Sequence, residues 1–181
     1  TLAFSAIQNN DKVGLLLFSD EIELFIPPKK GKTHVLRIIR ELLEFEPKSR
    51  RTDFTHALRY LSNVMKKKAI VFVLSDFMDE GYDNALKIVG KKHDVTGIRV
   101  YDKIEEELPK LGMVPMKDAE TGEVVLVNTN SKAVRTNYRA NYLKTVDFFE
   151  NAFTKSGSGI IHTRLDESYV KKLLSYFKRR N

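Results

Sequence analysis

Apolar residues are distributed along the chain in two ways, as short unbroken runs and as longer stretches with helical spacing. Unbroken runs occupy residues 13–18 and 69–74, and residues 95–101 are expected to form a further strand. Such runs of Val, Ile, Leu and Phe are typical of strands that are buried on both faces, as in a parallel sheet. Residues 22–26 alternate instead, which predicts a half-exposed strand paired as an antiparallel edge hairpin with the strand before it. Residues 159–162 predict a short last strand.

The stretches between these runs carry apolar residues at every third or fourth position, which predicts helices. We expect helices after Thr33, from near Asp53 to the lysine run 66–68, around 83–92, over about 132–155, and after Asp166. Thr33 and Asp166 are expected to cap the helices that follow them. The first residues resemble the second half of an amphipathic helix.

Residues 109–130 break this alternation of strands and helices. Two short apolar stretches flank the sequence DAETGE, in which Gly122 suits a turn, so we expect an antiparallel hairpin over 112–128 that turns near Thr121-Gly122. The whole pattern predicts an α/β fold, with a doubly wound, mostly parallel sheet and an added antiparallel hairpin. We expect a single domain over 1–181, with the hairpin as an insertion.

Length and composition narrow the class of protein. A chain of 181 residues suits one α/β domain, and its apolar runs are too short to span a bilayer. The absence of cysteine excludes disulfides and thiolate metal sites and permits a reducing, cytoplasmic location. The chain does not begin with Met, so we expect a fragment that lacks an upstream part, and a membrane tether in that part stays open. The net charge of +7 weakly favours acidic partners.

Common catalytic motifs do not fit this sequence. Gly31-Lys32-Thr33 resembles the end of a P-loop, but the first glycine of that motif would fall on Ile26. The four histidines, at positions 34, 56, 93 and 162, are not at metal-ligand spacing. There is no G-x-S-x-G motif. The sequence therefore shows no nucleophile, base or cofactor loop.

Two polar residues lie in loops at the ends of predicted strands or helices and are candidates for a binding site. Asp76 ends the apolar run 69–74, and ligands bind outside the carboxyl ends of strands in open α/β sheets. Thr52 lies in the loop that precedes the helix beginning near Asp53. A Thr hydroxyl and an Asp carboxylate on neighbouring loops would suit Mg²⁺. The alternative is that Asp76 or Asp79 caps the helix after this strand.

Several stretches in this order resemble the von Willebrand factor type A (vWA) fold, in particular the vWA-like domain of the bacterial domain-of-unknown-function family fifty-eight. They are NNDKVGLLLFSD, RRTDFTHALRYL, AIVFVLSDFMD, DAETGEVVLVNT and LDESYVKKLLSYFKRR. The resemblance covers almost the whole chain. In that family a metal-ion-dependent adhesion site combines a D-x-S-x-S element with a Thr and an Asp, which Thr52 and Asp76 match here. The D-x-S-x-S element is absent, and its place would lie just before Thr1.

The resemblance implies a protein-interaction module and not an enzyme. Mg²⁺, Mn²⁺ or Ca²⁺ would bind in the full-length parent, where a carboxylate of a protein partner completes the metal shell. We expect this fragment to be metal-free, because it lacks three side-chain ligands. It also lacks the first strand of the vWA sheet, which would lie between the strands 13–18 and 69–74. Self-association of the fragment is one way to cover these two strands. The implied partner is a MoxR-class AAA+ ATPase, in assembly or maturation of protein complexes. Arg50, Arg51, Asp53 and Asp79 are candidate partner contacts.

Two other functions compete with this interpretation. Lys29, Lys30, Lys32, Lys48, Arg50 and Arg51 could form a basic surface that binds a polyanion or nucleic acid, although no nucleic-acid-binding motif accompanies them and a solvated surface is favoured. The third hypothesis is a small-molecule enzyme of doubly wound architecture with Asp76 as the catalytic residue.

Overall fold

Three parallel strands form the principal sheet, in the order β3 (Ile70–Ser75), β4 (Asp94–Tyr101), β7 (Gly159–Arg164). The structure is a computed structural model that describes residues 1–117 and 122–180. β4 is the middle strand, and Val95 to Arg99 are buried along it. The prediction that residues 69–74 are buried on both faces is wrong for Ile70 and Leu74, which are 66% and 60% exposed. β3 is an edge strand of this sheet, and the covering helices leave these two side chains open.

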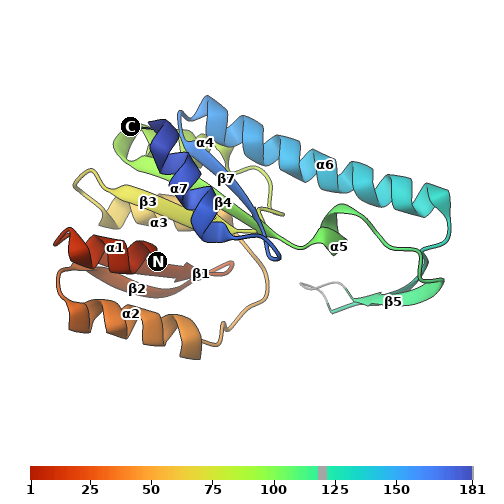
Figure 1. Cartoon of the computed structure of the whole chain (residues 1–181), viewed down its shortest axis with the longest axis horizontal. Coiled ribbons are helices and arrows are strands. Elements are labelled where there is room, and N and C mark those ends of the chain that lie inside the picture. The colour runs from red at the N-terminus through yellow and green to blue at the C-terminus, as the bar shows by residue number, and fades with distance from the viewer. Residues whose placement is uncertain (118–121, 181) are drawn as a thin grey trace. The chain divides into compact units, whose positions relative to one another are not determined.

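Helices cover both faces of this sheet, as the predicted doubly wound architecture requires. Neighbouring residues of a strand point to opposite faces. A Cβ atom added to Gly97 would lie 2.5 Å from Phe153 of α6 (Lys132–Lys155), whereas Thr96 Oγ1 lies 3.0 Å from the Tyr176 hydroxyl of α7 (Tyr169–Arg180). α6 and α7 therefore pack on opposite faces, and α4 (Asp83–Lys92) packs beside α6 (Figure 1).

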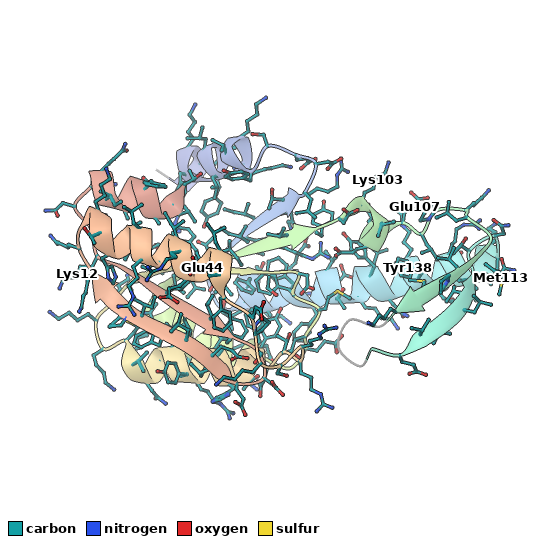
Figure 2. All side chains as sticks on the ribbon, turned by 90° about the horizontal axis from the view of Figure 1, so that it is seen from below. Lys12, Glu44, Lys103, Glu107, Met113 and Tyr138 are labelled. Carbon is teal, nitrogen blue, oxygen red and sulfur yellow. The ribbon has the colours of Figure 1, made fainter. Side chains whose placement is uncertain are left out.

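The predicted hairpin is confirmed as a separate antiparallel pair, β5 (Met113–Lys117) and β6 (Val124–Asn128). Gly122 has φ +74°, a left-handed conformation that favours glycine, while Thr121 lies outside the described residues. The sequence did not predict α5 (Lys103–Glu106), which is too short to show a helical period. The Tyr138 hydroxyl donates to the carbonyl oxygen of Ile104 at 3.2 Å and ties α5 to α6 (Figure 2).

Contacts divide the chain into two compact units, Thr1–Leu61 and Ser62–Asn181. The first unit contains the predicted antiparallel hairpin of β1 (Val13–Phe18) and β2 (Ile22–Lys29), with helices α1 (Leu2–Gln8), α2 (Lys32–Glu44) and the start of α3 (Phe54–Val64). Phe18 packs edge-on against Phe54, with ring centroids 5.1 Å apart, and Phe25 packs against Tyr60 in the same manner. These aromatic pairs attach α3 to the hairpin within the first unit.

Two predicted helix caps are wrong. α2 begins at Lys32 after Gly31, so Thr33 lies inside its first turn and provides no cap. α7 begins at Tyr169, and the amides of its first turn bond to Ser168, with Lys172 N donating to the Ser168 carbonyl and Lys171 N to Oγ. Asp166 lies too far before this start and pairs with Arg164 instead.

Among the described residues, no helix has the length and apolar character needed to cross a membrane.

Candidate functional site

The turn that follows β3 carries Asp76, the candidate binding residue of the second unit. Asp76 is exposed, and its Oδ1 accepts hydrogen bonds from Met78 N and Ser75 Oγ, both at 3.3 Å. Asp79 Oδ1 accepts from Glu80 N at 2.8 Å. α4 starts only at Asp83, with Tyr82 at its N-cap position and no side-chain cap. Neither Asp76 nor Asp79 therefore caps this helix, and the capping alternative is wrong.

Phe77 holds this turn in place. It has φ +56°, a left-handed conformation that is unfavourable for a bulky side chain. Its amide donates to Ser75 Oγ at 3.0 Å, and its fully buried ring lies 4.2 Å from the ring of Phe149 and 5.3 Å from that of Phe153, centroid to centroid. Backbone strain of about 1–3 kcal/mol persists only where the surroundings enforce it. Aromatic packing behind the turn thus presents Asp76 to solvent in a fixed position.

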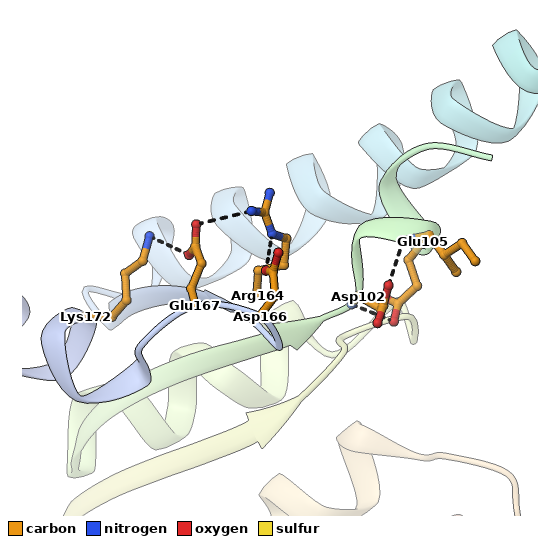
Figure 3. A network of polar contacts seen from close by, with 7 residues as sticks. Asp102, Glu105, Arg164, Asp166, Glu167 and Lys172 are labelled. Carbon is orange, nitrogen blue, oxygen red and sulfur yellow. Dashed lines mark hydrogen bonds and ion pairs between the residues drawn. The ribbon is translucent and has the colours of Figure 1, made fainter. Parts of the chain in front are cut away.

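Other polar side chains follow β4 and β7 at the same edge of the sheet. Asp102 and Glu105 form a capping box at the start of α5, and Arg164 pairs with Asp166 and Glu167, the latter also pairing with Lys172 (Figure 3). The hydrogen bond from Arg164 lowers the pKa of Asp166, and the same bond raises the pKa of Arg164. These carboxylates cap a helix or form ion pairs, whereas Asp76 accepts its hydrogen bonds from its own turn.

The loop that carries Thr52 belongs to the first unit and is attached to the β1–β2 turn. Glu23 Oε1 accepts from Ser19 Oγ at 2.8 Å and from the amide of Lys48 at 3.0 Å. The amide of Asp53 donates to the Ser19 carbonyl at 3.1 Å. The hydrogen bond from Ser19 lowers the pKa of Glu23, which keeps it ionised as an acceptor. Thr52 is exposed between these anchored positions.

The other predicted contact residues have different environments. Asp53 Oδ1 accepts from His56 N at 2.8 Å, so this carboxylate caps α3. Arg50 and Arg51 are exposed. Thr52 lies in the first unit and Asp76 in the second, so their proximity stays a prediction.

Magnesium prefers six oxygen ligands in an octahedron and retains several waters. The described residues contain no group of three or more His, Asp or Glu side chains that could hold a metal ion. One Asp76 carboxylate, with an oxygen already accepting two hydrogen bonds, and one Thr52 hydroxyl are too few to bind this ion firmly. These two residues do not make a Mg²⁺ site by themselves.

Sequence reasoning missed three residues with unusual environments. Phe77 and Glu23 support the two loops, but neither an aromatic residue after Ser-Asp nor an acid in an alternating strand is a specific signal. Arg99, in contrast, interrupts the apolar stretch of β4, and a buried charge there could have been suspected.

Solved structures with a similar fold cover nearly all of the chain. One is the conserved hypothetical protein BatB from Bacteroides thetaiotaomicron, with a TM-score of 0.52 and 15% identity over 99% of this chain and 84% of that one. Another is an aerotolerance-related membrane protein from Bacteroides fragilis, with a TM-score of 0.55 and 17% identity over 98% of this chain and 85% of that one. At these identities the likeness concerns the fold alone, and it agrees with the α/β architecture.

Sequence comparison gives more specific relatives. The uncharacterized protein Rv1480 of Mycobacterium tuberculosis is 26% identical over 117 residues, which are 63% of this chain and 37% of that protein. The uncharacterized protein MAV169 of Mycobacterium avium is 24% identical over 165 residues, 86% of this chain and 93% of that protein. The chain thus spans little more than a third of the length of Rv1480. Residues 1–146 match the family described as "Protein of unknown function DUF58", and the chain belongs to this family.

Proposed function

We propose that this chain is a non-catalytic protein-interaction module of the vWA type, with the Asp76 turn at the centre of its contact surface. The observation that carries the proposal is the left-handed Phe77, buried behind an exposed Asp76. Strain of this kind is concentrated where a backbone must present a functional group. The carboxylates that follow β4 and β7 form a capping box or pair with Arg164. Asp76, which follows β3, takes part in neither arrangement.

In this proposal the partner contacts the turn and residues on the Thr52 loop, including Arg50 and Arg51. The family resemblance supports a MoxR-class AAA+ ATPase as the partner. By the same resemblance, Thr52 and Asp76 match only two of the several ligand positions of the vWA ion site. In that site a carboxylate of the partner completes the metal shell.

Binding of a purified MoxR-class ATPase, measured by biolayer interferometry, tests the assignment. Asp76→Asn keeps an oxygen that accepts from Met78 N but removes the charge, so we expect at least tenfold weaker binding, roughly 1.4 kcal/mol. Asp147→Asn, at an exposed position of α6, is the matched control and should bind like the wild type. Equal affinities for wild type and Asp76→Asn would contradict the role of this turn.

Calorimetry with Mg²⁺ tests the ion site separately. We expect no appreciable binding by this chain and clear binding by a form extended at its N-terminus with a vWA first strand that carries a D-x-S-x-S element. Equal binding by the two forms would contradict the adhesion-site assignment.

A second function, polyanion binding, is favoured by the exposure of all six basic residues of the first unit named above, Lys29, Lys30, Lys32, Lys48, Arg50 and Arg51. It predicts polynucleotide affinity that falls steeply with salt, because each neutralised phosphate releases counterions. An interaction module that uses Asp76 predicts no such binding. Titration with a polynucleotide at several salt concentrations distinguishes the two.

A further inference from the structure

An open cavity of about 450 Å³ lies in the second unit, at the end of the parallel sheet where β7 begins. Its walls are the loop between α6 and β7 and the last turns of α7 (Figure 1). The polar side chains that line it belong to Ser158, Tyr176, Arg179 and Arg180, and no carboxylate of the described residues joins them. A volume of this size is typical of sites for small molecules, and two arginines favour an anionic one.

The loop wall of this cavity is fixed by its own backbone and by two glycines. The amide of Ser158 donates to the Phe153 carbonyl at 2.9 Å. Gly157 has φ +72°, which favours glycine. A Cβ atom added to Gly159 would lie 1.8 Å from the Tyr176 hydroxyl, so this glycine lets α7 approach the start of β7 closely. Because the wall is formed before any ligand binds, little ordering is needed on binding.

Tyr176 and Arg180 hold each other in place on the helical wall. The Tyr176 hydroxyl lies 3.0 Å from Oγ1 of the fully buried Thr96 and accepts from Arg180 Nη1 at 3.2 Å. Arg180 Nη2 donates to Asp94 Oδ1. A guanidinium group has more N–H donors than these two bonds use, so Arg180 is oriented beside the cavity and still has donors for a ligand.

Arg179 supplies the charge that no carboxylate offsets. It lines the cavity, is exposed, and forms no ion pair within the described part of the chain, whereas Asp94 offsets the charge of Arg180. Cations are favourable at the C-terminus of a helix, which accounts for Lys178, Arg179 and Arg180 as a group. The helix dipole does not account for a cavity that two of these three border together with the Ser158 hydroxyl.

We propose that this cavity binds the phosphate group of a small phosphorylated molecule. Arg179 and Arg180 bind the phosphate oxygens from α7, and the Ser158 hydroxyl donates from the loop. Donors on two walls suit the tetrahedral phosphate, whereas a planar carboxylate is satisfied by one guanidinium alone. The cavity is larger than a phosphate ion, so an organic group has room beside it. Asp76 follows the other end of β3, so this site is independent of the Asp76 turn.

NMR titration of the chain with inorganic phosphate and with glycerol 3-phosphate, at constant ionic strength against chloride, tests the proposal. We expect the amide resonances of Gly157 and Gly159 to shift and saturate, with tighter binding of the ester, while that of Gly112 in the hairpin stays unchanged. Arg179→Gln should weaken binding at least tenfold. Lys178→Gln is the matched control, since it removes the same charge from an adjacent exposed position outside the cavity, and should weaken binding less than about twofold.

Several results would overturn the proposal. One is a loop whose resonances respond no more to phosphate than to chloride. Equal weakening by Arg179→Gln and Lys178→Gln would show a diffuse attraction to the positive helix end and no site. Acetate that shifts the same resonances as strongly as phosphate would contradict the choice of phosphate. Binding of inorganic phosphate without binding of glycerol 3-phosphate would contradict the room for an organic group.

Discussion

At the scale of single residues, Phe77 connects the core to the candidate site. Its left-handed backbone is tolerated because its ring fills a pocket formed by Phe149, Phe153 and Tyr82. The same side chain thus stabilises the second unit and positions Asp76, its neighbour in the sequence.

Phe77→Ala should lower the free energy of unfolding by about 3–5 kcal/mol, because it removes a fully buried ring and leaves a cavity. Urea denaturation measures this change. Met78→Ala, at an adjacent exposed position, should have a much smaller effect. Similar losses for both variants would show that the packing of Phe77 does not hold the turn.

His93 is a buried titratable residue at the other end of the sheet. Its Nδ1 accepts from the amide of Ala69 at 3.3 Å, which places the proton of the neutral ring on Nε2. Burial lowers the pKa of His93 from 6.5, and the neighbouring Lys92 lowers it further. The unfolded chain therefore binds more protons than the folded one below about pH 6.5, so the stability is complete above this pH and is lost as pH falls through the folded pKa.

His93→Asn can keep an acceptor for Ala69 N while removing the titration. The free energy of unfolding, measured between pH 7.5 and pH 5, should therefore fall less in this variant than in the wild type. Measuring no lower than pH 5 limits the contribution of carboxyl titration to this change. Asp166 and Glu23, for example, have ordinary pKa values of 3.8 and 4.5. A residual slope is expected from His162, whose pKa is also lowered. Parallel pH curves for wild type and variant would exclude the assignment to His93.

At the scale of elements, the β5–β6 hairpin depends on its base. Thr129 is fully buried, and its amide and Oγ1 both donate to the Gly112 carbonyl, at 2.8 and 2.9 Å. Its Oγ1 also accepts from the amide of Leu111 at 2.8 Å. A two-stranded hairpin is only marginally stable alone, so these bonds close a structure whose strands have little other support.

Thr129→Val preserves the shape of the side chain but leaves the Leu111 amide without this acceptor, which should cost about 1–3 kcal/mol locally. Amide hydrogen exchange across residues 111–129 should become faster, while exchange in β4 stays unchanged. Thr136→Val, at an exposed position of α6, serves as the control. Unaltered exchange at the hairpin would mean that Thr129 does not secure its base.

At the scale of the whole molecule, the chain contains two compact units, and the boundary at Leu61 and Ser62 falls inside α3. Because α3 has residues in both units, we expect unfolding of one unit to disturb the helix that the other shares. The single domain over 1–181 stays a prediction.

Scanning calorimetry should therefore show one cooperative transition, with equal calorimetric and van't Hoff enthalpies. Phe54→Ala in the first unit and Phe77→Ala in the second should each lower the midpoint of that transition. Two separate transitions, each sensitive to only one of the variants, would contradict the single domain.

The sequence alone was sufficient for the types and order of most elements. Apolar runs predicted β1 and β3, a strand was expected where β4 lies, and helical spacing predicted α6 over the range that it occupies. Alternation and turn residues predicted the two hairpins. These features depend on local periodicity, which any one stretch carries by itself.

The tertiary structure decided which strand is central, how the caps are used and where the unusual residues lie. β4 is the middle strand of the three because distant segments of the chain pair with it on both sides. Ser168 and not Asp166 caps α7, because this helix begins later than the position of Asp166 suggested. The left-handed Phe77 and the buried Arg99 depend on side chains from α6, more than forty residues away in the sequence. Local periodicity contains no information about such contacts, since they form only when β3, β4 and α6 pack together.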